Sequence, residues 1–280
     1  MISPCWEPDF LQASPMFEPL RLAGSGLERL NNWPASGDLQ RLRDNAAAPL
    51  VSKSGKPICF VPQNDAARPA REFAQQYEPR IYLAGEVQTR TQNWHDLFNA
   101  LVWITFPRTK AALNQLHYHA LLQQRDDEKV QRGALRDAAT LLDESGVIVV
   151  SSDAGLVKLL QDFEWKDLFW RQRESVCAHM RFFLFGHGLY EKALKPYTGM
   201  TGKGIILPVE QDYFNRPLAV QLAAADSMLD NFLSRNRVTP AILTPVPLLG
   251  YPGWTPDNAD ATYYDNSNYF RPHPQRAATM

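Results

Sequence analysis

The chain has 280 residues, of which 45% are hydrophobic and 21% are charged, and its formal net charge is −1. A globular chain of this length and composition needs no disulfide or structural metal to fold, and its near-zero charge argues against strong, sequence-independent binding to nucleic acid or anionic lipid. The three cysteines are far apart and form no CxxC pair, which excludes a disulfide framework and a zinc ribbon.

The first 65 residues are rich in Pro, Gly, Asn and Ser but also carry several aromatic side chains. Aromatic residues are scarce in disordered tails, so we expect this segment to wrap over the core as an arm. Short helices are predicted over residues 17–30 and 38–47, and a short extended piece is predicted over residues 57–62.

A further helix is predicted over residues 71–77, immediately before the pair Glu78-Pro79. The residue before a proline avoids the α-helical conformation, so the helix is expected to stop there. Residues 81–83 would then form a short strand that ends at Gly85.

The strongest helical pattern runs over residues 93–106, where apolar side chains recur at helical spacing. Thr91 or Asn93 can cap its start, and Pro107 is expected to end it and to begin the next helix. Gly146 is expected to end a later helix in the left-handed conformation. The further helices are predicted over residues 108–124, 128–145, 153–163, 165–176, 187–194 and 217–235.

Buried strands are indicated by three apolar runs, at residues 147–152, 181–186 and 204–209. Their alternation with helices predicts βαβ-like units. The expected fold class is therefore mixed, helix-rich α/β, with central helices packed against a small sheet and N- and C-terminal arms wrapping the core. We expect one domain over residues 1–280, made of an arm (1–65), a core (66–236) and an ordered tail rich in proline and aromatics (237–280).

The sequence contains no P-loop, GxGxxG, HExxH, GxSxG or EF-hand motif, so the common nucleotide, zinc-protease and lipase sites are not indicated. Polar residues inside apolar helices remain as candidates. In the first set, His95 and Asn99 are four apart and share a helix face, and Asp96 in the first turn suits the helix dipole. The structural alternative is that these residues cap the helix and pair with Arg90.

The second set lies near the end of the third long helix. Asp137, Thr140 and Glu144 share one helix face, whereas Arg136 and Asp143 lie with Thr140 on a neighbouring face. Carboxylates presented in this way can hold a hard cation or serve as a general base. The structural alternative is an exposed helix C-terminus, where acids oppose the dipole and Arg136 is expected to compensate them.

The third set begins at His187, which follows a predicted strand and opens a helix. Ligands of open α/β sheets collect at the carboxyl ends of strands, and Glu191 lies four residues further along on the same helix face. A structural histidine is the alternative. His117 and His119 are two apart on a helix, point to different faces, and are interpreted as surface residues.

Several short stretches of the sequence resemble those of one known family. They stand at residues 89–90, 93–103, 106–110, 136–144, 185–187, 191–192, 249–254 and 270–272. In this order they are similar to the bacterial domain-of-unknown-function family 3025, and the resemblance runs from about residue 57 to the end. It implies a bacterial origin but no assigned activity, so no catalytic role is carried over.

We therefore predict a small-molecule or phosphate-ester binding protein with a hydrolase-like site, in which Mg²⁺ or Mn²⁺ is the cofactor and an arginine clamps a small anionic ligand. The candidates are catalytic His95, Asp96 and His187, metal-ligating Asp137, Glu144 and Glu191, and substrate-binding Arg90, Asn99, Arg136 and Thr140. The competing hypothesis is a non-catalytic scaffold or interaction protein whose polar residues form a closed network. A concave pocket with unused hydrogen-bonding groups would favour the first.

Location and partners follow from what the sequence lacks. The N-terminal residues do not have the pattern of a signal peptide, and no apolar run is long enough for a membrane span. We therefore expect a cytoplasmic protein without membrane contact. Nucleic acid is not an expected partner, because acidic residues are interleaved with the basic ones.

Overall fold

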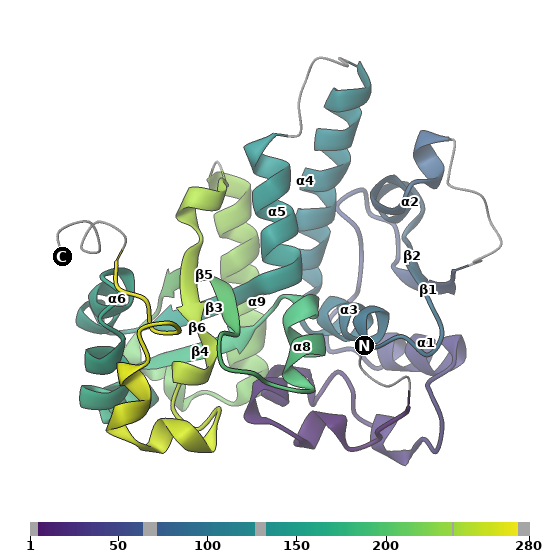
Figure 1. The fold of residues 1–280 in the computed structure, drawn as a ribbon. Coiled ribbons are helices and arrows are strands. Elements are labelled where there is room, and N and C mark those ends of the chain that lie inside the picture. The colour runs from purple at the N-terminus through teal and green to yellow at the C-terminus, as the bar shows by residue number, and fades with distance from the viewer. Residues whose placement is uncertain (1–4, 64–71, 127–132, 237, 274–280) are drawn as a thin grey trace.

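The computed structural model describes residues 5–63, 72–126, 133–236 and 238–273, and helices dominate it (Figure 1). The mixed, helix-rich α/β class predicted from the sequence is confirmed. The α-helices are α1 Ser36–Asp44, α2 Tyr77–Ala84, α3 Trp94–Thr105, α4 Pro107–Asp126, α5 Ala134–Ser145, α6 Ala154–Gln161, α7 Arg173–His179, α8 His187–Ala193 and α9 Leu218–Arg235. The strands are β1 Cys59–Pro62, β2 Glu86–Thr89, β3 Gly146–Ser151, β4 Met180–Leu184, β5 Thr201–Pro208 and β6 Thr244–Pro247.

The larger sheet has the strand order β4-β3-β5-β6. Every residue of β3 is buried, as its β-branched run predicts. β3 is parallel to β5 but antiparallel to β4. A βαβ unit requires two parallel strands. The prediction is thus wrong for β3 and β4, because the segment with α6 and α7 that connects them leads into an antiparallel strand. β6, which contains two prolines, was not predicted; it lies at the sheet edge, where prolines are tolerated.

The smaller sheet pairs β1 with β2 in parallel, and it contacts α1 and α2. On the larger sheet, α5 and α9 contact both β3 and β5, while α4 packs against α2, α5 and α9 (Figure 1). α4 thus contacts helices that pack on each of the two sheets. None of the helices in the described ranges is both long and apolar enough to cross a membrane.

Helix α2 replaces the strand predicted after Pro79. This proline stands in the first helical turn, where the backbone N–H groups have no intrahelical partner, so its missing N–H costs nothing. Gly85 ends the helix at φ 77°, and its N–H donates to the carbonyl of Ile81. The helix predicted over residues 71–77 is reduced to a 3₁₀ turn at Phe73–Gln75 in the described part of the chain.

Three other helix boundaries differ from the prediction. Gly146 is extended, at φ −68°, rather than left-handed, because α5 passes directly into β3. Residues 17–30 form only 3₁₀ turns, since Pro19 lies inside the segment. Residues 165–176 divide into a π-helical turn, Asp167–Arg171, and the start of α7. The predicted start of α5 at residue 128 lies outside the described residues.

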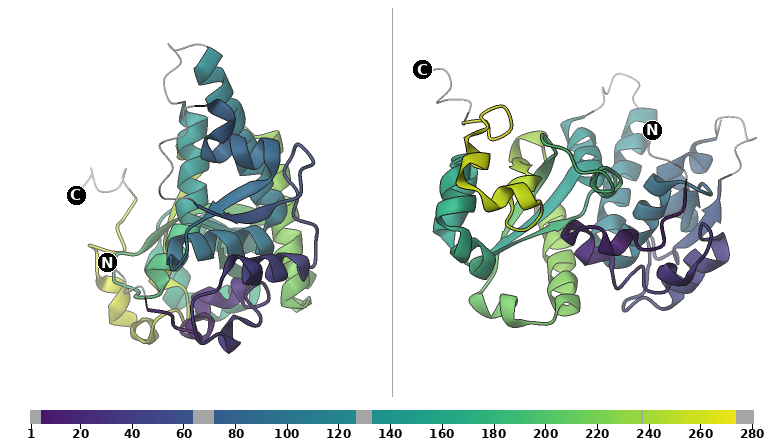
Figure 2. Two further views of the ribbon diagram at one scale, coloured as in Figure 1. Left: turned by 90° about the vertical axis from the view of Figure 1, so that its right-hand side faces the viewer. Right: turned by 60° about the horizontal axis from the view of Figure 1, so that its bottom comes forward.

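Both arms are packed on the core (Figure 2). The N-terminal 3₁₀ helix Pro15–Leu20 contacts α3, α8 and β4. In the tail, the hydroxyl of Tyr269 donates to the carbonyl of Met200 at 2.8 Å, and the indole of Trp165 donates to the carbonyl of Arg271 at 2.7 Å. The tail is thus bonded to the residue that precedes β5 and to Trp165, which precedes the π-helical turn.

Candidate functional site

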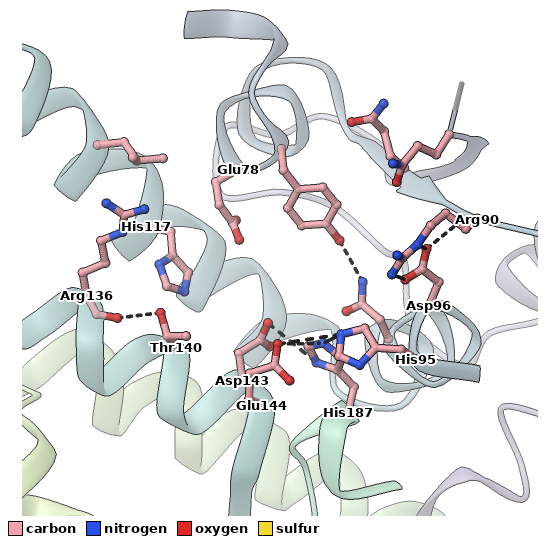
Figure 3. Close-up of a pocket in the computed structure, with 15 residues that line it drawn as sticks. Glu78, Arg90, His95, Asp96, His117, Arg136, Thr140, Asp143, Glu144 and His187 are labelled. Atoms are coloured by element: carbon pink, nitrogen blue, oxygen red, sulfur yellow. Dashed lines mark hydrogen bonds and ion pairs between the residues drawn. The ribbon is translucent and has the colours of Figure 1, made fainter. Parts of the chain in front are cut away.

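A cavity of about 350 Å³ lies between α2, α3, α4, α5 and α8 (Figure 3). Its volume falls within the range of small-molecule sites, but its wall is far more polar than is usual for them. The lining residues are Gln63, Tyr77, Glu78, Gln88, Arg90, His95, Asp96, Asn99, His117, Leu121, Arg136, Thr140, Asp143, Glu144 and His187. The chain therefore has a concave pocket, which is the first of the two features expected of a binding site.

Two imidazoles and one carboxylate converge in this cavity. The Nε2 atoms of His95 and His187 are 2.9 Å apart. The Oε1 atom of Glu144 lies 3.7 Å from Nε2 of His95 and 3.5 Å from Nε2 of His187. Three atoms that are common metal ligands thus form a small triangle.

The triangle has the dimensions of one face of a metal coordination sphere. Ligand atoms about 2.0–2.1 Å from a tetrahedral zinc ion are separated from one another by roughly 3.3 Å. The three observed separations, 2.9, 3.5 and 3.7 Å, lie around that value. A single ion bound by these three atoms would retain an open position for water or substrate.

The second ring nitrogen of each imidazole faces a carboxylate, at hydrogen-bond distance for His95 but not for His187, whose Nδ1 has no hydrogen-bond partner among the described residues. Nδ1 of His95 lies 3.1 Å from Oε2 of Glu191, and Nδ1 of His187 lies 3.8 Å from Oδ2 of Asp143. Metal-bound histidines usually donate their second N–H to a carboxylate, which fixes the tautomer and orients the ring. Glu191 stands where such an orienting group belongs and leaves Nε2 of His95 to face the centre of the triangle, whereas Asp143 is the carboxylate that faces Nδ1 of His187 without a hydrogen bond.

The two acids at the end of α5, Asp143 and Glu144, both have lowered pKa values. A hydrogen bond from His187 lowers the pKa of Glu144 and outweighs the opposite effect of burial. Burial would raise the pKa of Asp143, but the ammonium of Lys110, 2.5 Å away, holds it at about 2. A metal ligand must be deprotonated, and Glu144 meets that requirement. Lys110, and not Arg136 as predicted, compensates the acids at the end of α5.

The register of β3 and β4 brings Glu144 and His187 together. Val147 of β3 pairs with Leu184 of β4, so the residues just before β3 meet the residues just after β4. The N–H groups of Phe185 and Gly186 both donate to the carbonyl of Gly146. A Cβ atom on Gly186 would lie 2.5 Å from backbone nitrogens of α5 and β3, so only glycine permits this approach.

Gly188 gives a test of how closely Glu144 must approach α8. A Cβ atom at this position would lie 3.0 Å from the backbone carbonyl oxygen of Glu144 and 2.7 Å from its Oε2. Because that atom is the end of a flexible side chain, Gly188→Ala is expected to turn the carboxylate away at a cost of roughly 1 kcal/mol in stability. We expect at least tenfold weaker metal binding, measured by isothermal titration with Zn²⁺. Unchanged affinity would mean that Glu144 does not contribute a ligand atom.

The wall opposite the triangle is formed largely by α2 and α4. Glu78 and His117 point from it into the cavity (Figure 3). Burial raises the pKa of Glu78, although His117 and a hydrogen bond from Asn114 oppose the increase. His117 is only 7% exposed, so its interpretation as a surface residue is wrong. α4 turns that face toward α2 and α5 rather than toward solvent.

The two arginines of the cavity differ in their partners. Arg90 forms a bidentate pair with Asp96, with contacts of 2.8 and 3.0 Å. Asp96 therefore pairs with Arg90, as the structural alternative to a catalytic role predicted. Arg136 donates to the neutral amide of Gln124 at 3.1 Å and has no carboxylate partner within the described ranges. Thr140, beside it, donates to the carbonyl of Arg136 at 2.9 Å.

Residues 58–274 match the model of a family described as "Protein of unknown function (DUF3025)". The chain belongs to the DUF3025 family. This confirms the resemblance drawn from the sequence, and every residue that lines the cavity falls within the match. No curated protein and no solved structure matches the chain.

The structure brings most, but not all, of the predicted site residues of this DUF3025 protein to the cavity. Nearly all of them line the cavity or, like Glu191, contact a residue that does. Asp137 does not line it; seven residues before Glu144 on α5, it is displaced by about 10 Å along the helix axis. Tyr77 and Glu78 were missed because α2 was not predicted, and no local pattern marked Lys110 as the partner of Asp143.

Proposed function

We propose that this DUF3025 protein is a metal-dependent hydrolase that acts on small anionic molecules. His95, His187 and Glu144 would bind the metal ion. The observation that carries the proposal is the triangle of their ligand atoms, whose sides match those of a tetrahedral coordination sphere. The carboxylate of Glu191, within hydrogen-bond distance of Nδ1 of His95, supports it further.

The donor set is better matched to Zn²⁺ than to the Mg²⁺ or Mn²⁺ predicted from the carboxylates. Mg²⁺ demands oxygen ligands in near-octahedral geometry, whereas two imidazole nitrogens with one carboxylate suit zinc and its neighbours in the first transition row. Two histidines and a glutamate with one open position also form a recurrent catalytic zinc site.

The cavity supplies groups for moving protons. A bound Zn²⁺ would act as a Lewis acid and lower the pKa of a water molecule at the site. Glu78, across the cavity, has a raised pKa and can take a proton from that water and return it to the leaving group. His95 and His187, first predicted as bases, act as ligands in this proposal.

The charges of the cavity define the substrate that it accepts. Arg136 is free of carboxylate partners in the described part of the chain, and it can bind an anionic group. The other lining arginine is neutralised by Asp96. One unpaired arginine together with a divalent cation favours a small monoanion over a polyanion such as nucleic acid.

The proposal is tested by removing and restoring the metal. Protein treated with a chelator would be reloaded with Zn²⁺, Co²⁺, Mn²⁺ or Mg²⁺ and assayed against small carboxylated esters and amides and phosphate monoesters. We expect hydrolysis only after reloading, with zinc or cobalt most effective. Hydrolysis that survives the chelator, or inactivity with every metal on the whole panel, would contradict the proposal and favour the scaffold hypothesis.

Glu78→Gln refines the same experiment. Loss of a general acid–base group is expected to lower kcat by about 10²–10⁴-fold while zinc binding is retained, because Glu78 is not among the three ligand residues. Glu174→Gln, an exposed substitution on α7, is the matched control and should leave kcat unchanged. Equal rates in both variants would remove Glu78 from the mechanism.

A further inference from the structure

Asn99 carries a buried polar atom that the fold does not satisfy. The side chain lines the cavity and is 7% exposed. Its Nδ2 donates to the hydroxyl oxygen of Tyr77 at 2.8 Å, whereas its Oδ1 is buried and has no hydrogen-bond partner among the described residues. Buried polar atoms in native proteins are nearly always paired, so this oxygen is expected to accept a hydrogen bond from a ligand.

Tyr77 offers the complementary group beside it. The residue as a whole is 40% exposed, but desolvation of its phenol raises the pKa above the ordinary value, so the hydroxyl stays protonated. Its oxygen already accepts from Asn99, and within the described ranges its O–H donates to no protein group. A donor and an acceptor therefore stand side by side. This pattern complements the C=O and N–H of a carboxamide.

The donor–acceptor pair lies next to the proposed metal ligands. Asn99 follows His95 by four residues on α3, so the two side chains share one helix face. An amide held by Asn99 and Tyr77 therefore lies beside the imidazole of His95. Arg136, eight residues before Glu144 and thus about 12 Å from it along the axis of α5, lines a more distant part of the same cavity (Figure 3), where it would bind an anionic group at the other end of the molecule.

We propose that the substrate is a carboxylate-bearing amide of the N-acyl amino acid class. Its amide pairs with Tyr77 and Asn99, and its carboxylate pairs with Arg136. This inference rests on the proposed hydrolase function. In the reaction, the oxygen of water bonds to the carbonyl carbon, the C–N bond breaks, and the nitrogen leaves with a proton returned through Glu78. The products are a carboxylate and an amine.

Binding of a matched amide and ester tests the inference directly. N-acetyl-L-alanine and O-acetyl-L-lactate differ in that an ester oxygen replaces the amide N–H. Titration calorimetry on zinc-loaded Glu78→Gln protein, in which turnover is suppressed, is expected to show at least tenfold tighter binding of the amide. The ester cannot donate to Asn99 and places an oxygen against it, and sites built around such a donor reject analogues that lack it.

Variants assign the preference to particular side chains. Asn99→Leu is expected to abolish the amide-over-ester ratio, whereas Arg136→Met should weaken both ligands alike and leave the ratio unchanged. If Asn99→Leu does not fold, the comparison in the intact cavity still decides. Equal affinities, a preference for the ester, failure of both ligands to bind, or a ratio that survives Asn99→Leu would overturn the inference.

The experiments distinguish failure of the hydrolase proposal from failure of the proposed amide subsite. Chelator-sensitive hydrolysis of esters or phosphates without any amide preference would leave the hydrolase and refute the amide subsite. An amide preference in protein that binds no metal would support the subsite and refute the hydrolase.

Discussion

His187→Ala is expected to abolish the stabilisation of this protein by zinc. A ligand at about a hundred times its dissociation constant raises the free energy of unfolding by about 2.7 kcal/mol. His187 supplies one of the three converging ligand atoms and is 4% exposed, so without it the ion would keep only two ligands of the triangle. Thermal unfolding of chelator-treated protein with and without added Zn²⁺ measures the effect.

The control for this prediction is another histidine of the same chain. His119 is exposed on α4 and lies outside the triangle, so His119→Ala should keep the full zinc-dependent shift. Each variant is compared with its own metal-free form, which separates metal binding from intrinsic stability. A zinc response in His187→Ala equal to that of the unmodified protein would contradict the assignment.

Lys110→Met is expected to destabilise the fold by about 3–5 kcal/mol, because it leaves a buried carboxylate without its cation. The side chain of Lys110 is 5% exposed, its ammonium lies 2.5 Å from Asp143, and it also lies over the ring of Trp103. Urea-induced unfolding at neutral pH measures the loss. Lys158→Met is the matched control. The ion pair of Lys158 with Asp162 is exposed, so the free energy of unfolding is expected to change by less than about 1 kcal/mol.

The same pair predicts a dependence of stability on pH. The pKa of Asp143 is lowered from its ordinary value to about 2, so its ionised form is stabilised in the folded state. Its contribution is complete above about pH 4 and is lost as the pH falls toward 2. Lys110→Met should remove this acid-sensitive component. A variant as stable as the unmodified protein would show that the buried pair contributes nothing.

Local sequence patterns predicted most of the elements that build the site. The apolar spacing of α3, the cap at Asn93, the start of α4 at Pro107 and the buried run of β3 all appear as expected. These features depend on neighbours within one or two turns of the chain. The proline rule failed at α2 because a first-turn position tolerates what a helix interior does not.

The grouping of the site residues could not be predicted in the same way. His95 and His187 are 92 residues apart, and their meeting depends on the packing of α3 against α8. Helix spacing placed Asp137 and Glu144 on one face, but only the turn that adjoins β3 reaches the histidines. Likewise, no spacing rule shows that Lys110 on one helix neutralises Asp143 on another.

Anomalous diffraction at the zinc absorption edge, from crystals of the protein grown with Zn²⁺, tests the central claim most directly. The account predicts one peak per chain, about 2.0–2.2 Å from Nε2 of His95, Nε2 of His187 and an oxygen of Glu144. Absence of a peak there, with the two imidazoles still hydrogen-bonded to each other, would contradict it.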